Sequence, residues 1–331
     1  MSDVLLSLNE LTVAFKTKKG MAQAVRGVTF DVHRGESIAV VGESGSGKSV
    51  TVLGLMGLLP RSAQIGGSAV FDGIELVGLP THDMRAIRGN RISMIFQDPM
   101  TAFNPVYTIG DQIIEALEVH GKYAGKEATR RAIDLLELVG VPEPAQRVNQ
   151  YPHEFSGGMR QRAMIAMAIS NDPELLIADE PTTALDVTVQ AQVMEVLSDI
   201  RAETGAAMIL ITHDLGLVAG AAERVEVMYG GRVFEEGTLE QVFYHPMNPY
   251  TRGLLSSMPR LDAIGDRLIP IEGTPPSIIN MPSGCAFAPR CAHREGVCDE
   301  RSATLEIIEP GHRSRCHLTS QLPAFSREVT A

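Results

Sequence analysis

The sequence has no apolar run long enough to cross a membrane. Its longest stretch that is apolar and free of charge, residues 49–60, is too short to span a bilayer. The N-terminal residues 1–3 also lack the basic and apolar regions of a signal peptide. We therefore expect the chain to stay in the cytoplasm.

Blocks of like charge are missing as well. The formal net charge is −11, and no basic stripe runs through the chain. Nonspecific binding to nucleic acid or to an anionic lipid surface needs such a stripe. Any association with a membrane is therefore expected to depend on a protein partner.

Cysteine is scarce and unevenly placed. All four cysteines of the 331 residues fall in the last fifth of the chain. In a reducing compartment, clustered thiols favour metal binding over disulfides. The length and a hydrophobic fraction of 44% suit one large α/β domain with a smaller appended module.

A glycine-rich segment follows the apolar run 37–41. It matches the phosphate-binding loop (P-loop) pattern Gly-x-x-x-x-Gly-Lys-Ser/Thr, in which backbone N–H groups at a helix N-terminus surround phosphates. Lys48 is expected to reach the β- and γ-phosphates of a nucleotide, and Ser49 to bind Mg²⁺. The P-loop residues are Gly42, Glu43, Ser44, Gly45, Ser46, Gly47, Lys48 and Ser49.

The pattern of apolar residues predicts strands before the P-loop, a helical segment over about 108–171, and further strands at 175–178 and 207–212. Strands alternating with helices indicate a parallel sheet, whose ligands gather at the carboxyl ends of the strands. The sequence contains no internal repeat.

Two acidic residues follow the apolar strand 175–178. Asp179 is expected to hold Mg²⁺ through water, and Glu180 to polarise the water that attacks ATP. Adjacent acids at a strand end are common, so the assignment of these two roles depends largely on the P-loop upstream.

A second candidate anion site precedes a helical run. Ser156, Gly157 and Gly158 place backbone N–H groups at its N-terminus, although Ser156 also fits as an ordinary N-cap. Phe15, at the end of an early strand, similarly has two possible roles, as a core residue or as a face for adenine stacking.

Together these motifs resemble the ATP-binding cassette (ABC) ATPases over about residues 4–257. The resemblance implies a P-loop ABC ATPase fold: an N-terminal antiparallel β subdomain, a parallel-sheet core, an inserted helical subdomain and a small cysteine-containing C-terminal extension. It also implies a head-to-tail dimer, with each ATP between one chain's P-loop and the other chain's Ser-Gly-Gly signature. Here Phe155 and Met159 replace the family's usual flanking Leu and Gln.

The resemblance implies further site residues. His213 is expected to contact the γ-phosphate, Gln97 to reach Mg²⁺ and link the site to a membrane partner, and Asp186 to cross the dimer interface.

Segments 95–101, 151–162 and 178–192, with the cysteine tail, resemble more closely the ATPases of bacterial oligopeptide and dipeptide importers. The implied partners are a second, different ATPase chain, two transmembrane permease subunits and an extracytoplasmic peptide-binding protein, so this chain is expected at the cytoplasmic face of the membrane. Related importers of nickel or glutathione remain alternatives. A nucleic-acid ABC ATPase fits poorly, because no coiled coil or basic stripe is present.

The cysteine spacing Cys-x5-Cys-x6-Cys-x17-Cys is wider than the close pairs of common zinc sites. A 4Fe-4S cluster, zinc with help from histidine, and free structural thiols all remain open from spacing alone. The resemblance to importer ATPases favours a 4Fe-4S cluster. The candidate ligands are Cys285, Cys291, Cys298 and Cys316.

These features predict three parts. Residues 1–257 form the nucleotide-binding domain, 258–283 a proline-rich linker, and 284–331 the four-cysteine extension.

Overall fold

The computed structural model describes residues 3–18, 20–183, 185–258 and 270–325. Its backbone divides into two compact units. The first unit comprises residues 1–3, 33–37 and 78–211, and the second comprises 4–32, 38–77 and 212–331. The predicted boundaries at 257 and 283 stay a prediction, since the four-cysteine segment falls within the second unit.

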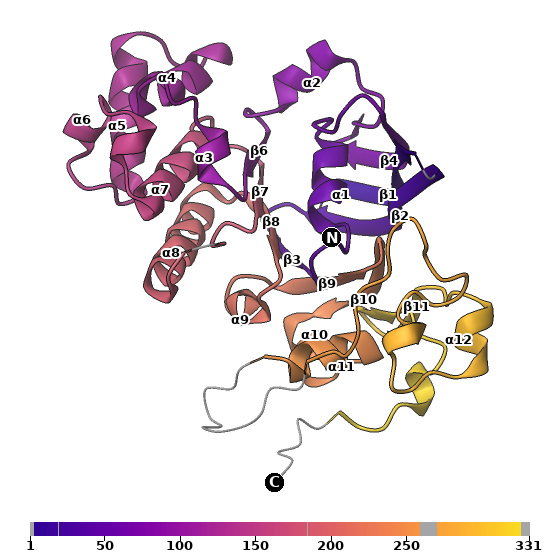
Figure 1. Cartoon of the computed structure of the whole chain (residues 1–331). Coiled ribbons are helices and arrows are strands. Elements are labelled where there is room, and N and C mark those ends of the chain that lie inside the picture. The colour runs from indigo at the N-terminus through magenta and orange to yellow at the C-terminus, as the bar shows by residue number, and fades with distance from the viewer. Residues whose placement is uncertain (1–2, 19, 184, 259–269, 326–331) are drawn as a thin grey trace. The chain divides into compact units, whose positions relative to one another are not determined.

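An antiparallel sheet opens the second unit, in the order β2-β1-β4-β5. Leu6 of β1 pairs with Phe71 of β4, and both are fully buried, because directly opposed residues lie on the same face of an antiparallel pair. Figure 1 shows β1, β2 and β4 side by side with helix α1 beside them. The strands are β1 (Val4–Thr17), β2 (Gly20–His33), β4 (Ala63–Phe71) and β5 (Ile74–Glu75).

The second unit also contains a mixed sheet. β3 pairs in parallel with β9, and β9, β10, β12 and β11 follow as antiparallel neighbours. β9 and β10 form a hairpin that turns through Gly230 and Gly231. The strands are β3 (Ser37–Val41), β9 (Arg224–Tyr229), β10 (Arg232–Thr238), β11 (Glu306–Glu309) and β12 (His312–Ser314).

Helices of this second unit flank its sheets. They are α1 (Lys48–Leu55), α9 (Leu215–Val218), α10 (Leu239–Tyr244), α11 (Pro249–Ser256) and α12 (Gly296–Glu300), with 3-10 turns at Ala288–Arg290 and Thr319–Gln321.

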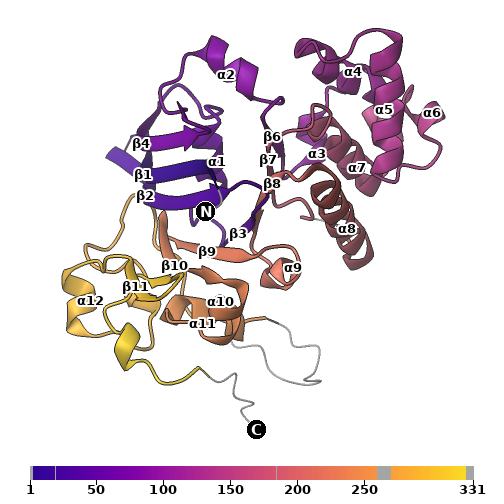
Figure 2. The same ribbon diagram turned by 180° about the vertical axis from the view of Figure 1, so that it is seen from behind.

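The first unit contains parallel strands and the predicted helical segment. β6 (Ile92–Ile95), β7 (Leu175–Asp179) and β8 (Ala207–Thr212) pair in parallel. Both views show α4, α5, α6 and α7 grouped together, as expected for residues 108–171 (Figures 1 and 2). The helices are α2 (Thr81–Ile87), α3 (Pro99–Ala102), α4 (Ile109–Val119), α5 (Lys126–Leu138), α6 (Pro144–Arg147), α7 (Gly157–Ala168) and α8 (Val187–Thr204), with a 3-10 turn at Pro152–Glu154.

Helix α4 has a complete capping box at its N-terminus. Thr108 Oγ1 accepts a hydrogen bond from the Asp111 N–H, and the Asp111 carboxylate accepts one from the Thr108 N–H. This reciprocal pairing satisfies two donors that a helix start leaves unpaired. It fixes the point where the helical segment begins.

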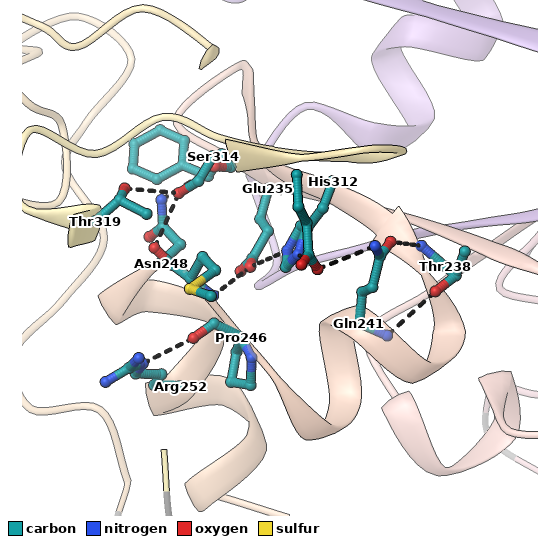
Figure 3. A network of polar contacts seen from close by, with 12 residues as sticks. Glu235, Thr238, Gln241, Pro246, Asn248, Arg252, His312, Ser314 and Thr319 are labelled. Atoms are coloured by element: carbon teal, nitrogen blue, oxygen red, sulfur yellow. Dashed lines mark hydrogen bonds and ion pairs between the residues drawn. The ribbon is translucent and has the colours of Figure 1, made fainter. Parts of the chain in front are cut away.

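A buried polar network joins β12 to β10 and to the turn before α11 (Figure 3). His312 Nε2 lies 2.8 Å from Glu235 Oε1, and its Nδ1 lies 3.1 Å from Glu309 Oε1. Asn248 Nδ2 donates to the carbonyl oxygens of Phe234 and Arg315. Burial lowers the pKa of His312, but the two carboxylates outweigh it and leave that pKa raised.

No helix among the described residues is sufficiently long and apolar to cross a membrane.

Candidate functional site

The P-loop connects buried strand β3 to helix α1, as the sequence predicts. Gly42, Gly45 and Gly47 all have positive φ, a region that other residues adopt at a cost. A Cβ on Gly42 would lie 2.2 Å from the Met228 carbonyl oxygen, so β9 leaves room only for glycine. Gly47 is the N-cap of α1 and offers no side-chain cap, so the backbone N–H groups there can serve a ligand.

Lys48 and Ser46 place polar atoms inside this loop. The Lys48 ammonium donates hydrogen bonds to the carbonyl oxygens of Gly42, at 2.6 Å, and Glu43, at 3.1 Å. Ser46 Oγ is buried with no hydrogen-bond partner among the described residues. A buried hydroxyl of this kind suits a ligand that accepts hydrogen bonds, as phosphate does. Ser49 is half-buried in the first turn of α1.

Glu43 is held by residues far along the chain. Its N–H donates to the Tyr250 hydroxyl at 2.9 Å, and its carboxylate pairs with Arg290. Sequence reasoning missed both partners, because a separation of more than 200 residues leaves no local pattern. Ser44 is exposed in the loop, and Phe15 is half-buried on β1, opposite Ala63 of β4.

In the first unit, the residues after β7 form a hydrogen-bonded group. Asp179 is buried at the end of β7, and Glu180 follows it with φ of 46°. Glu180 Oε2 accepts hydrogen bonds from Gln97 Nε2 and Thr183 Oγ1, both at 2.8 Å. The structure thus brings together two predicted site residues, Glu180 and Gln97, which are 83 residues apart. A carboxylate fixed in this way can orient and polarise water.

The signature also begins a helix, but with different local geometry. Ser156 is the N-cap of α7, and its Oγ accepts a hydrogen bond from the Met159 N–H at 3.3 Å. Ser156 and Gly157 are exposed. Phe155 is buried, so this departure from the family pattern adds to the core and leaves the Ser-Gly-Gly unchanged.

Two further predicted residues lie at exposed positions. Asp186 is the N-cap of α8, and its Oδ1 accepts a hydrogen bond from the Val189 N–H at 3.0 Å. His213 directly follows β8 and is exposed. The P-loop, Phe15 and His213 belong to the second unit, whereas Gln97, the signature, Asp179, Glu180 and Asp186 belong to the first.

The four cysteines line one small cavity of about 20 Å³ in the second unit. Burial raises the pKa of the Cys285 and Cys316 thiols, and raises that of Cys291 to about 11. A metal would have to displace these thiol protons to bind. Within the described ranges, no group of three or more His, Cys, Asp or Glu side chains could hold a metal ion. The predicted 4Fe-4S cluster therefore remains a prediction.

Comparison with known proteins finds matches in both the N-terminal and the C-terminal part of the chain. The family model described as "ABC transporter" matches residues 25–183, and that described as "Oligopeptide/dipeptide transporter, C-terminal region" matches residues 234–298. The chain is 53% identical over 319 residues to a dipeptide transport ATP-binding protein of Bacillus subtilis (strain 168), covering 96% of this chain and 95% of the relative. It is 49% identical over 315 residues to an oligopeptide transport ATP-binding protein of Escherichia coli (strain K12), covering 95% and 93%.

A solved structure of a dimeric ATP-binding cassette, bound to ADP and Pi in a post-hydrolysis state, superposes with a TM-score of 0.64 at 28% identity. It covers 71% of this chain and 98% of the cassette.

Proposed function

This chain belongs to the ATP-binding proteins of the ABC transporter family, in the oligopeptide/dipeptide branch, and we propose that it hydrolyses ATP to energise import of short peptides across a membrane. The observation that carries the proposal is identity of about half, over nearly the full length, to two peptide transport ATP-binding proteins. The match of residues 234–298 to the oligopeptide/dipeptide C-terminal region supports the same branch.

The working complex in this proposal contains more than one kind of subunit. This chain pairs head to tail with a second, different ATPase chain, beneath two permease subunits at the cytoplasmic face, and an extracytoplasmic binding protein delivers the peptide. Each ATP then lies between the P-loop of one chain and the signature of the other.

Each predicted residue has a role in this arrangement. Lys48 and the P-loop N–H groups bind the β- and γ-phosphates, while Ser49, Gln97 and Asp179 hold Mg²⁺ directly or through water. The metal neutralises charge that develops on the phosphates. Glu180 polarises the attacking water and His213 contacts the γ-phosphate. Ser156, Gly157, Gly158 and Asp186 complete the partner chain's site, and Phe15 stacks on adenine.

Two substitutions separate binding from hydrolysis. In the assembled transporter, Glu180→Gln should leave ATP affinity intact and lower steady turnover about a hundredfold or more, because the water loses its polarising carboxylate. Lys48→Ala should instead weaken nucleotide binding, because the phosphate charge loses its fixed cation. Turnover and ATP affinity are measured side by side. Near-normal hydrolysis by Glu180→Gln would contradict the role assigned to Glu180.

Dependence on partners has its own test. Purified chain alone should hydrolyse ATP slowly, and addition of the permease subunits and the second ATPase should raise the rate. Full activity of the isolated chain, unchanged by partners, would contradict the heteromeric complex.

The peptide substrate is tested through the binding protein that copurifies with the permease subunits. Mass spectrometry of its bound solute should find di- or oligopeptides. If the binding protein instead holds nickel or glutathione, the chain belongs to a related importer of that solute.

We also propose that the four cysteines hold a 4Fe-4S cluster. Support comes from the one cavity that all four line, and from the half-buried cation Arg315, which lines the same cavity and can offset the negative charge of a thiolate-ligated cluster. The four cysteines of a 4Fe-4S cluster lie farther from one another than the ligands of a single metal ion do, because each cysteine binds a different iron. The cluster's contribution here is structural, stabilising a small segment as metal centres do in small domains.

Protein purified without oxygen should contain iron and acid-labile sulfide, with a broad visible absorption. Stoichiometric zinc without iron would overturn the cluster. Unchanged iron content in Cys298→Ser would remove that residue from the ligand set.

A further inference from the structure

Arg290, next to Cys291 in the four-cysteine segment, reaches into the P-loop. Its Nη1 and Nη2 lie 2.5 and 2.9 Å from the two carboxylate oxygens of Glu43, a bidentate ion pair between residues 247 positions apart. The Arg290 side chain is only 4% exposed. Such pairing is stronger and more directional than the contact of a surface lysine.

All five N–H donors of this guanidinium have an acceptor. Besides the two Glu43 oxygens, the acceptors are the Tyr229 hydroxyl and the carbonyl oxygens of Ile271 and Glu272. Only an arginine offers five donors in one plane, so no other side chain satisfies this set. The guanidinium also lies 5.9 Å from the ring centroids of Tyr229 and Phe287.

The surroundings make this contact rigid. Arg290 closes a 3-10 turn that begins at Ala288, and Ala288 and Phe287 line the cysteine cavity. The Phe287 ring packs on Tyr250 with centroids 5.3 Å apart, and the Tyr250 hydroxyl accepts the hydrogen bond from the Glu43 N–H. Glu43 is therefore fixed at both its backbone and its carboxylate by parts of the chain beyond residue 228.

Glu43 stands at a position where its own charge matters. Its carbonyl oxygen accepts a hydrogen bond from Lys48, the cation expected to bind phosphate. An uncompensated carboxylate this close to a phosphate site would repel a polyanion, whereas a carboxylate paired with a buried guanidinium is neutralised.

We propose that Arg290 is a positioning residue of the nucleotide site, which neutralises and fixes Glu43 so that the P-loop accepts the charge of ATP. The four-cysteine segment thereby acts on nucleotide affinity through one side chain. This inference rests on the proposed function, since it requires that the P-loop binds ATP.

The test removes the charge of Arg290 alone and then the charges of both members of the pair. With full-length chain and a fluorescent, slowly hydrolysed ATP analogue plus Mg²⁺, Arg290→Gln should bind about tenfold more weakly, because Glu43 is left unpaired. The loss should be smaller for the ADP analogue, which carries less charge, and should shrink in high salt. The double variant Glu43→Gln/Arg290→Gln should recover affinity to within about twofold of the native chain. Damage to the fold alone would not be repaired by a second substitution.

Arg294→Gln is the matched control, because Arg294 lies in the same segment but pairs with Asp299 at the surface, where both side chains are about half exposed. It should bind like the native chain. Arg290→Lys keeps the charge without the bidentate contact and should lose about threefold, so it tests the inference if Arg290→Gln does not fold.

Native affinity in both Arg290 variants overturns the inference, and so does a loss in Arg290→Gln that Glu43→Gln fails to repair. Failure of the proposed function would give a different result. The native chain then does not bind the analogue, or Lys48→Ala binds it as well as the native chain does.

Discussion

Two helices of this molecule begin at glycine-rich segments, the P-loop and the signature. The reason for the glycines differs between the two segments. In the P-loop, the chain itself requires them, because Gly42 has positive φ and backbone of β9 occupies the space of its missing Cβ. In the signature, Gly157 is an ordinary helical residue with no atom within 4 Å of where its Cβ would be. A glycine that the fold does not need is a candidate for contact with something outside the chain.

The largest expected effect is that of breaking the P-loop turn. Gly42→Ala should lower the free energy of unfolding by about 3 kcal/mol or more, because the new methyl group meets the Met228 carbonyl oxygen at a positive φ. Urea denaturation of the full chain measures it. Gly45→Ala is the control, since its positive φ adds strain but no atom lies within 4 Å of its Cβ. An equal cost for both substitutions would contradict the steric explanation.

The signature should respond in the opposite way. Gly157→Ala should leave the free energy of unfolding unchanged or raise it by about 0.5 kcal/mol, because alanine is the better helix former. In the assembled transporter, ATP turnover should nevertheless fall by about tenfold or more, because the methyl group would obstruct the partner's nucleotide. Stability and turnover are measured on the same preparation. Normal turnover would show that Gly157 faces no ligand.

A smaller effect concerns the pH dependence of stability. It arises in the unit that holds the P-loop and not in the unit that holds the signature. The raised pKa of His312 means that its pairing with Glu235 and Glu309 stabilises the fold fully below about pH 6.5, the ordinary value for histidine, and that this contribution is lost as pH rises through the folded-state pKa. His312→Gln should remove this pH-dependent contribution, seen as a flatter profile of unfolding free energy as pH rises above about 6.5. His82→Gln is the control, since His82 is an exposed histidine of the other unit. An unchanged profile in His312→Gln would rule out this linkage.

The sequence predicted those parts of the fold and site that depend on neighbouring residues. The P-loop, the capped start of α7 and the acidic end of β7 are local patterns, and the structure has each where it was expected. Element lengths were less well predicted. The apolar pattern indicates a strand only over residues 28–32, whereas β2 begins at Gly20, because residues 20–27 lack a clear apolar run.

Long-range polar contacts could not be predicted at all. No local pattern singles out Arg290, yet its guanidinium is buried against Glu43. Which acid pairs with which arginine depends on how distant segments pack, and the amino-acid composition does not predict that packing. Gln97 and Glu180 were each predicted as site residues, but their hydrogen bond follows from the pairing of β6 with β7.

The pairing of β12 with β10 has a consequence for solubility. β10 is an almost wholly buried strand, and residues 312–314 cover the edge that would otherwise present unpaired N–H and C=O groups. Exposed edges of this kind recruit strands from other molecules. A chain shortened to residues 1–257 would thus gain a self-associating edge, and the C-terminal segment protects the cassette against aggregation whether or not its cysteines bind metal.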